Sequence, residues 1–232
     1  AMQAGGMSVS SITSPVFLVA LLATGLCLAV NLRWAPQGRA VFEERKESLF
    51  FDNLDAFLQA REIETVVVVT SEERFAHLDP GTGKPVLRVD GDRERFLSVI
   101  RGLDAFPSPP AYVAVHDGAR PLILPEQIDQ VIKASRDEGA AALARRVTET
   151  IKTTDDNDFT HRSVPRDRLW IMETPQAFRF EILRRAYRAT ESQALEVTDD
   201  VSAAEAIGVP TRLVENLLSN LKVTLPQDLA LA

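Results

Sequence analysis

Cysteine is nearly absent from this chain of 232 residues, which holds only Cys27. A single cysteine excludes an intrachain disulfide and a cysteine zinc cluster, and it predicts a reducing cytoplasm as the compartment. Histidine is almost as rare, and His77, His116 and His161 lack the spacing of metal ligands. The sequence therefore predicts no metal site built from protein side chains.

An excess of basic residues is also missing. Lys and Arg number 26 against 33 Asp and Glu, which gives a net charge of −7. Binding to duplex nucleic acid needs a basic face, so this composition argues against a nucleic-acid partner. An anionic small molecule must instead be met by a few well-placed Arg and Lys side chains.

No apolar run is long enough to span a membrane. The main candidate, Val16–Val30, is 15 residues long, and no Lys or Arg precedes it. A bilayer span needs about 20 residues, and a signal peptide needs a basic segment before its apolar core. A buried parallel strand that runs into an apolar turn explains this segment better, so we predict no membrane partner.

Strand and helix patterns alternate along the chain, as they do in α/β proteins. Strands are expected at Val16–Ala23, Thr65–Val69, Pro85–Val89, Ala111–Val115, Thr211–Val214 and Leu221–Thr224. Helices are expected at Glu47–Ala60, Arg93–Ala105, Pro125–Glu138, Phe180–Glu191 and Asp199–Ile207. This order predicts a mainly parallel twisted sheet with helices on both faces.

The stretch over 140–166 differs from the rest. Two extended segments flank a polar turn at 155–158, which is typical of a hairpin. We predict a two-stranded β-arm that projects from the sheet. Residues 1–15 are expected to form an N-terminal tail, of which Ala1–Gly6 resembles an expression tag, and 16–232 a single domain.

The most informative motif is HDGARP at 116–121, which directly follows the apolar run Ala111–Val115. In α/β proteins, ligands bind outside the carboxyl ends of the strands. A carboxylate (Asp117) and a guanidinium (Arg120) delivered there suit a small charged substrate, although ordinary turn chemistry is the alternative. Lys222 lies within a second apolar segment, where a buried lysine needs an anionic partner or a functional reason.

Several segments together resemble one known family. They are VHDGARP (115–121), ETIK (149–152), RLW (168–170), TPQAF (174–178), TDD (198–200) and SNLKVTLPQDLALA (219–232), with GDRERFLSV (91–99) matching a cytidine-loop region. The resemblance is to 2-C-methyl-D-erythritol 4-phosphate cytidylyltransferases, over about residues 16–232. It implies a Rossmann-like nucleotidyltransferase αβα sandwich with a projecting β-arm, a homodimer formed through that arm, and the use of CTP with Mg²⁺.

The resemblance also implies roles for single residues. It assigns the nucleotide to Gly25, Gly91 and Ser98, catalysis to Lys222, Asp117 and Arg166, and the sugar phosphate to Thr150, Thr174, Thr198 and Arg120. Thr150 and Arg166, on or beside the arm, would reach the partner subunit's site. The implied reaction is attack of a phosphate-monoester oxygen on the α-phosphorus of CTP, which releases pyrophosphate in a step of non-mevalonate isoprenoid synthesis. Catalysis of this kind is positioning plus neutralisation of charge.

The first loop departs from the family pattern Ala-Ala-Gly-x-Gly-x-Arg followed by Pro-Lys. Cys27, Ala29 and Gln37 replace its second glycine, its arginine and its lysine. Losing one placed transition-state donor commonly costs roughly 100–1,000-fold in rate. Asp92 also replaces a usual glycine and places an acid near the nucleotide.

Three functions therefore stay open. The first is a working cytidylyltransferase in which Arg33, Arg39 or Lys46 replaces the missing cations. The second is a pentitol-phosphate cytidylyltransferase. The third is a catalytically impaired homologue that binds nucleotide or sugar phosphate, or that pairs with a true enzyme.

Overall fold

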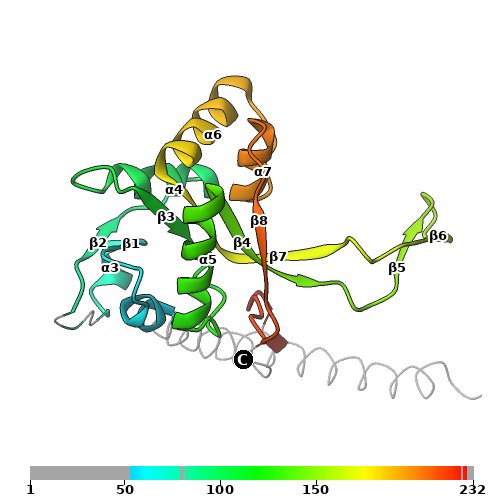
Figure 1. Cartoon of the computed structure of the whole chain (residues 1–232), viewed down its shortest axis with the longest axis horizontal. Coiled ribbons are helices and arrows are strands. Elements are labelled where there is room, and N and C mark those ends of the chain that lie inside the picture. Colours follow the sequence, from blue (N-terminus) through cyan, green and yellow to red (C-terminus); the bar gives the residue numbers. More distant parts are fainter. Residues whose placement is uncertain (1–52, 79–80, 82, 226, 229–232) are drawn as a thin grey trace, which may run out of the picture. The chain divides into compact units, whose positions relative to one another are not determined.

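A four-stranded sheet with the order β3-β7-β4-β8 forms the centre of the fold (Figure 1). The computed structural model describes residues 53–78, 81, 83–225 and 227–228. The strands are β3 (Tyr112–Val115), β4 (Ala140–Arg146), β7 (Trp170–Arg179) and β8 (Arg212–Glu215). β4 and β8 are parallel, whereas β7 is antiparallel to both β3 and β4.

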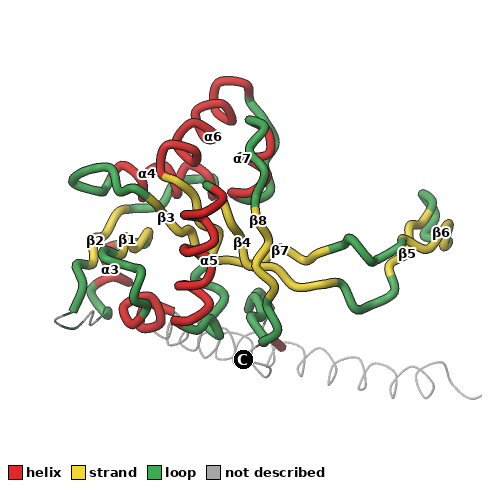
Figure 2. Tube along the Cα trace, viewed as in Figure 1, coloured by secondary structure: helices red, strands yellow, loops and turns green. Residues whose placement is uncertain are grey.

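Three strands of this sheet therefore point the same way, and β7 is reversed. The chain path explains the reversal, because β4 leads into a long excursion from which β7 returns to pair with β4. A separate parallel pair holds β1 (Val66–Val69) and β2 (Val86–Val89). Along the chain, the short helix α3 (Glu72–Phe75) connects these two strands (Figure 2).

Alternate residues of the central strands enter two separate hydrophobic clusters. Ala140, Ala142 and Phe178 belong to one cluster, and Ala141, Leu143 and Ala177 belong to the other. This period of two is the alternation of side chains between the faces of a sheet. Both faces of the four-stranded sheet are therefore buried.

Helices cover both faces. The first cluster includes residues of α4 (Arg95–Asp104), α6 (Phe180–Gln193) and α7 (Asp200–Ala206). The second includes residues of α5 (Pro125–Glu138) and of the helical stretch 53–59. The αβα sandwich predicted from the sequence is thus confirmed.

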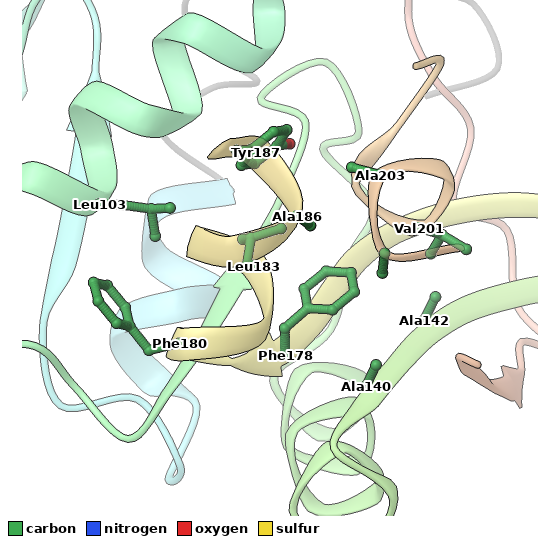
Figure 3. Packing of buried hydrophobic residues seen from close by; sticks show 11 residues of the cluster. Leu103, Ala140, Ala142, Phe178, Phe180, Leu183, Ala186, Tyr187, Val201 and Ala203 are labelled. Atoms are coloured by element: carbon green, nitrogen blue, oxygen red, sulfur yellow. The ribbon is translucent and has the colours of Figure 1, made fainter. Parts of the chain in front are cut away.

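Phe178 lies at the centre of the first cluster. Figure 3 shows its ring between Leu183 of α6 and Val201 of α7. The small side chains of Ala140 and Ala142 on the neighbouring strand leave room for this ring. Large and small residues thus interlock across the layer, as close packing requires.

The excursion between β4 and β7 forms the predicted arm. β5 (Ile151–Thr154) and β6 (Thr160–Val164) pair as an antiparallel hairpin, and they lie well away from the four-stranded sheet (Figure 1). At the root of the arm, the Arg146 guanidinium stacks 4.4 Å from the centre of the Trp170 ring. Arg146 also donates to Glu215 at 2.8 Å, so the base of the arm is held to β8.

One strand prediction is wrong. Residues 221–224 form no strand in the described chain, because this segment runs along the loop after β3, where the Val223 amide donates to the Ala119 carbonyl at 2.7 Å. The predicted strand Val16–Ala23 and the tail over 1–15 lie outside the described residues. In the described part of the chain, no helix combines the length and the apolar character needed to cross a bilayer.

Replacing Phe178 tests the packing of the first cluster. Phe178 is fully buried, so Phe178→Ala should lower the free energy of unfolding by about 3–5 kcal/mol through lost burial and a new cavity. Leu217→Ala is the control, because Leu217 is 86% exposed and should change the same quantity by less than about 0.5 kcal/mol. Urea titration followed by tryptophan fluorescence measures both, and equal losses would contradict the described core.

Candidate functional site

The loop after β3 places Asp117 in contact with three cations from separate segments. Lys222 Nζ donates to Asp117 Oδ2 at 2.8 Å. Arg95, the first residue of α4, donates to Asp117 Oδ1 at 3.3 Å. Arg120 Nε lies 3.8 Å from Asp117 Oδ2. Residues far apart in the sequence thus meet at the carboxyl end of β3, where α/β proteins bind their ligands.

Lys222 has the anionic partner that the sequence predicted, but it is not buried. Its side chain is 46% exposed, and the backbone bond from Val223 to Ala119 holds it over the loop. The ammonium therefore keeps one side toward solvent. It is available to a phosphate as well as to Asp117.

Asp117 is ionised in this setting. Burial of its side chain would raise the carboxyl pKa, but the hydrogen bond from Lys222 and the charges of Arg95 and Arg120 outweigh burial, so the pKa is lowered. The side chain is only 15% exposed. A mostly buried carboxylate without these cations would be costly.

A neutral network holds the backbone of the same loop. The Asp117 amide donates to Thr174 Oγ1 at 3.0 Å, and Thr174 Oγ1 lies 3.0 Å from His116 Nδ1. His116 Nε2 lies 2.9 Å from Asn53 Oδ1, while Asn53 Nδ2 donates to the Gly118 carbonyl at 2.8 Å.

These contacts decide the tautomer of His116. The Asn53 amide nitrogen is committed to a carbonyl, so its oxygen faces Nε2, which must carry the proton. Burial of the imidazole lowers the His116 pKa to about 4, so the ring is neutral and Nδ1 accepts. The Thr174 hydroxyl then donates to Nδ1. Both hydrogen-bonding roles of Thr174 are therefore used inside the protein.

Two buried polar atoms beside Asp117 lack a partner among the described residues: Arg120 Nε and Asn220 Oδ1. The rest of the Arg120 side chain is fixed, because Nη1 donates to the Asn220 carbonyl at 2.8 Å and Nη2 donates to the Met172 carbonyl at 3.4 Å. Buried polar atoms are nearly always hydrogen-bonded. Arg120 Nε is still compensated by the Asp117 carboxylate, which lies 3.8 Å away.

A cavity of about 890 Å³ opens between β1 and β3. Gly91, Ser98, Asp117 and Lys222 line it, together with apolar side chains of both strands. A Cβ added at Gly91 would meet Ser98 Oγ at 3.4 Å. Two of the three predicted nucleotide residues and two of the three predicted catalytic residues thus share one cavity.

Asp92 does not add a free negative charge to this cavity. Its carboxylate forms an ion pair at 2.6 Å with Arg101, which lies in the last turn of α4. Its backbone amide donates to Ser98 Oγ at 2.8 Å. The replacement of the usual glycine is therefore neutralised locally.

Other predicted residues lie elsewhere. Thr150 and Arg166 are exposed on the arm, and Arg166 donates to the Thr148 carbonyl rather than to the Asp117 cluster. Thr198 is exposed immediately before α7, where Asp199 is the N-cap and accepts from the Ser202 amide at 2.8 Å. Gly25 and the altered positions Cys27, Ala29 and Gln37 lie outside the described residues, as do Arg33, Arg39 and Lys46. Within the described ranges, no three His, Cys, Asp or Glu side chains are grouped to hold a metal.

Three residues of the site were missed by sequence reasoning: Arg95, Asp200 and His116. A signal for Arg95 was present, because a positive charge in the first turn opposes the helix dipole and calls for a specific partner. That partner is Asp200, which has no exposed surface. His116 lies inside the HDGARP motif, but nothing in the sequence shows that it would be half-buried and neutral.

Comparison with known proteins decides the family. The family model of 2-C-methyl-D-erythritol 4-phosphate cytidylyltransferase matches residues 39–232. This chain belongs to that family. A cytidylyltransferase of this name from Pelotomaculum thermopropionicum is 38% identical over 170 residues, which are 72% of this chain and 71% of the relative. The one from Caldanaerobacter subterraneus subsp. tengcongensis is 34% identical over 190 residues, which are 79% of this chain and 84% of the relative.

Solved cytidylyltransferase structures share the fold. The crystal structure from Thermus thermophilus has a TM-score of 0.67 and 32% identity, and the match covers 79% of this chain and 86% of that one. The 4-diphosphocytidyl-2C-methyl-D-erythritol synthase from Anaerococcus prevotii has a TM-score of 0.71 and 26% identity, covering 79% and 83%. The Rossmann-like nucleotidyltransferase fold expected from the sequence is confirmed. The family match begins after the altered first loop.

The neutral His116 predicts a pH dependence of stability. Its pKa is about 4 in the folded chain and about 6.5 when unfolded, so between these values the unfolded chain binds more protons. The contribution of His116 to the free energy of unfolding is therefore complete above pH 6.5. As the pH falls toward 4, the free energy of unfolding decreases by up to about 3 kcal/mol.

Urea unfolding of the wild type and His116→Gln from pH 4 to 8 measures this effect. The difference between the two free energies of unfolding should shrink as the pH falls, and a constant difference would contradict a buried neutral imidazole. His161→Gln, on the exposed arm, controls for the loss of an imidazole elsewhere.

Proposed function

We propose that this chain transfers the cytidylyl group of CTP to 2-C-methyl-D-erythritol 4-phosphate. The products are 4-diphosphocytidyl-2-C-methyl-D-erythritol and pyrophosphate, in non-mevalonate isoprenoid synthesis. Membership of the cytidylyltransferase family supports this activity. The observation that carries it is the 2.8 Å contact between Lys222 and Asp117, in one cavity with Gly91 and Ser98.

The reaction needs charge neutralisation more than covalent chemistry. An oxygen of the acceptor phosphate forms a bond to the α-phosphorus of CTP, and the bond from that phosphorus to the β-phosphate oxygen breaks with its electron pair. Lys222, half exposed above Asp117, neutralises charge on the phosphoryl oxygens. Preorganised charges of this kind lower the barrier without reorganisation during the reaction.

The remaining residues of the site bind and orient CTP and the acceptor. Gly91 and Ser98 contact the nucleoside, where the absence of a Cβ at Gly91 allows close approach. Arg120, paired with Asp117 at 3.8 Å, adds a fixed positive charge near the acceptor phosphate. Thr198, at the exposed start of α7, contacts the acceptor. Thr174 positions Asp117 without contacting the substrate, because its hydroxyl accepts a hydrogen bond from the Asp117 amide.

Mg²⁺ enters with the nucleotide in this proposal. Mg²⁺ in nucleotide sites keeps several waters and is bound largely through substrate phosphates. Both oxygens of Asp117 are already engaged, Oδ1 by Arg95 and Oδ2 by Lys222. The phosphates of CTP would therefore supply the ligands, and the bound metal would neutralise their charge.

The functional unit is a homodimer formed through the arm. Thr150 and Arg166 are exposed, and the hairpin that they flank lies away from its own sheet (Figure 1). Both residues would complete the acceptor site of the partner subunit. The single cysteine is consistent with a cytoplasmic setting.

Pyrophosphate release tests the activity. Wild-type protein with CTP, Mg²⁺ and 2-C-methyl-D-erythritol 4-phosphate should release pyrophosphate, and Lys222→Ala should lower the rate about 100–1,000-fold. Lys133→Ala is the control, because Lys133 is an exposed lysine of α5 paired with Glu62 and should keep the wild-type rate.

The outcomes separate the alternatives. No release by the wild type would overturn the proposal and favour an impaired homologue, and calorimetric titration with CTP would show whether nucleotide binding is retained despite Ala29 and Gln37. Release of pyrophosphate with a pentitol phosphate, but not with 2-C-methyl-D-erythritol 4-phosphate, would favour a pentitol-phosphate cytidylyltransferase. Equal rates for Lys222→Ala and the wild type would remove Lys222 from the mechanism.

A mixing experiment tests the shared site. If Lys222 and Arg166 of one site come from different subunits, Lys222→Ala and Arg166→Ala proteins that are each inactive should regain activity after unfolding and refolding together. In a random mixture half the dimers are mixed and half of their sites are intact, so about a quarter of the wild-type rate is expected. No recovery, or a monomeric mass by sedimentation at micromolar concentration, would contradict the shared site.

A further inference from the structure

The Arg95 guanidinium joins two carboxylates that belong to different parts of the fold. Nη1 and Nη2 donate to the two oxygens of Asp200 at 3.0 and 2.8 Å. Nε and Nη2 also donate to Asp117 Oδ1 at 3.3 Å. All three nitrogens are engaged, and the planar fork of arginine makes this double contact in a way that lysine cannot.

The Asp200 end of this bridge is fixed. Asp200 has no exposed surface, and the hydroxyl of Tyr187, on α6, donates to its Oδ1. The start of α7 is held to β7 as well, because the Val201 amide donates to Gln176 Oε1 at 3.0 Å. Asp200 therefore has little freedom to move.

The Asp117 end faces the cavity. Arg95 contacts Asp117 Oδ1, while Lys222 contacts the other oxygen, Oδ2. A carboxylate held at one oxygen presents the second in a defined direction. The position of the Lys222 ammonium thus depends on the Arg95 contact.

We propose that Arg95 is a positioning residue of the transfer reaction, which holds the Asp117 carboxylate against the buried Asp200 and thereby fixes Lys222. This role rests on the proposed function, because it assigns Arg95 to the same site. It also connects the nucleotide side to the reacting phosphates, since Arg95 begins the helix that carries Ser98. Arg95 acts through Asp117 and need not touch the substrate.

Arg95→Lys tests the role by kinetics. Lysine keeps the charge but cannot engage both carboxylates, so kcat should fall about 10–100-fold, as expected when a catalytic group is displaced, while KM for CTP changes by less than about threefold. Arg184→Lys is the matched control: Arg184, on α6, pairs with Asp104 at the opposite end of α4 from Arg95. Its kcat should equal that of the wild type.

Titration of Asp117 tests the contact without any activity. The experiment follows the ¹³C NMR signal of the Asp117 carboxyl carbon in protein labelled with ¹³C-aspartate. That signal is identified because it is missing from the spectrum of Asp117→Asn. In Arg95→Gln the pKa of Asp117 should rise by at least about 1, because a cation within hydrogen-bonding distance is removed. Should this variant fail to fold with Asp200 unpaired, Arg95→Gln combined with Asp200→Asn removes the buried charge and gives the same measurement.

The two measurements separate failure of this role from failure of the proposed function. An unchanged Asp117 titration would overturn the bridge. A shifted titration with equal kcat for Arg95→Lys and Arg184→Lys would overturn the positioning role. Absence of transfer by the wild type would contradict the proposed function and would leave the titration to decide the bridge.

Discussion

The ionised carboxylate of Asp117 is the constraint on which the rest of the site depends. A charge with so little exposure is costly unless it is paired, and its partners come from α4, from its own loop and from the segment after β8. Removing any partner leaves the carboxylate less compensated. The same requirement that brings Lys222 to the cavity therefore also fixes the ends of three separate segments around it.

Two different kinds of network support this residue. The carboxylate is held by charges, whereas its backbone is held by the neutral chain from Asn53 through His116 to Thr174. A protonated imidazole beside the loop would place a further positive charge in a half-buried position, where desolvation opposes it. A neutral His116 can hold the loop after β3 by hydrogen bonds without adding a further charge beside the Asp117 carboxylate.

The sequence predicted the layers and the arm because those depend on periodicity, which is local. It also predicted that Lys222 needs an anion, which is a general rule about lysine in apolar segments. The family resemblance also placed Lys222 in one site with Asp117, and the two are in contact. It was not predicted that Lys222 would stay half exposed, because residues 221–224 were expected to be a strand. The Arg95–Asp200 pair joins residues 105 positions apart, and no local pattern carries such a contact.

The difference in exposure between the two carboxylates and two of the cations explains how an acidic chain can bind phosphates. The carboxylates of Asp200 and Asp117 are 0% and 15% exposed, whereas the side chains of Arg95 and Lys222 are 38% and 46% exposed. Arg95 and Lys222 line the cavity, while Arg120, at 13%, is as buried as Asp117. Two carboxylates oppose three cations, counting Arg120, so the cluster has an excess of positive charge. A net charge of −7 over the whole chain is therefore compatible with an anionic ligand, because the local field at short range is set by the groups that line the cavity.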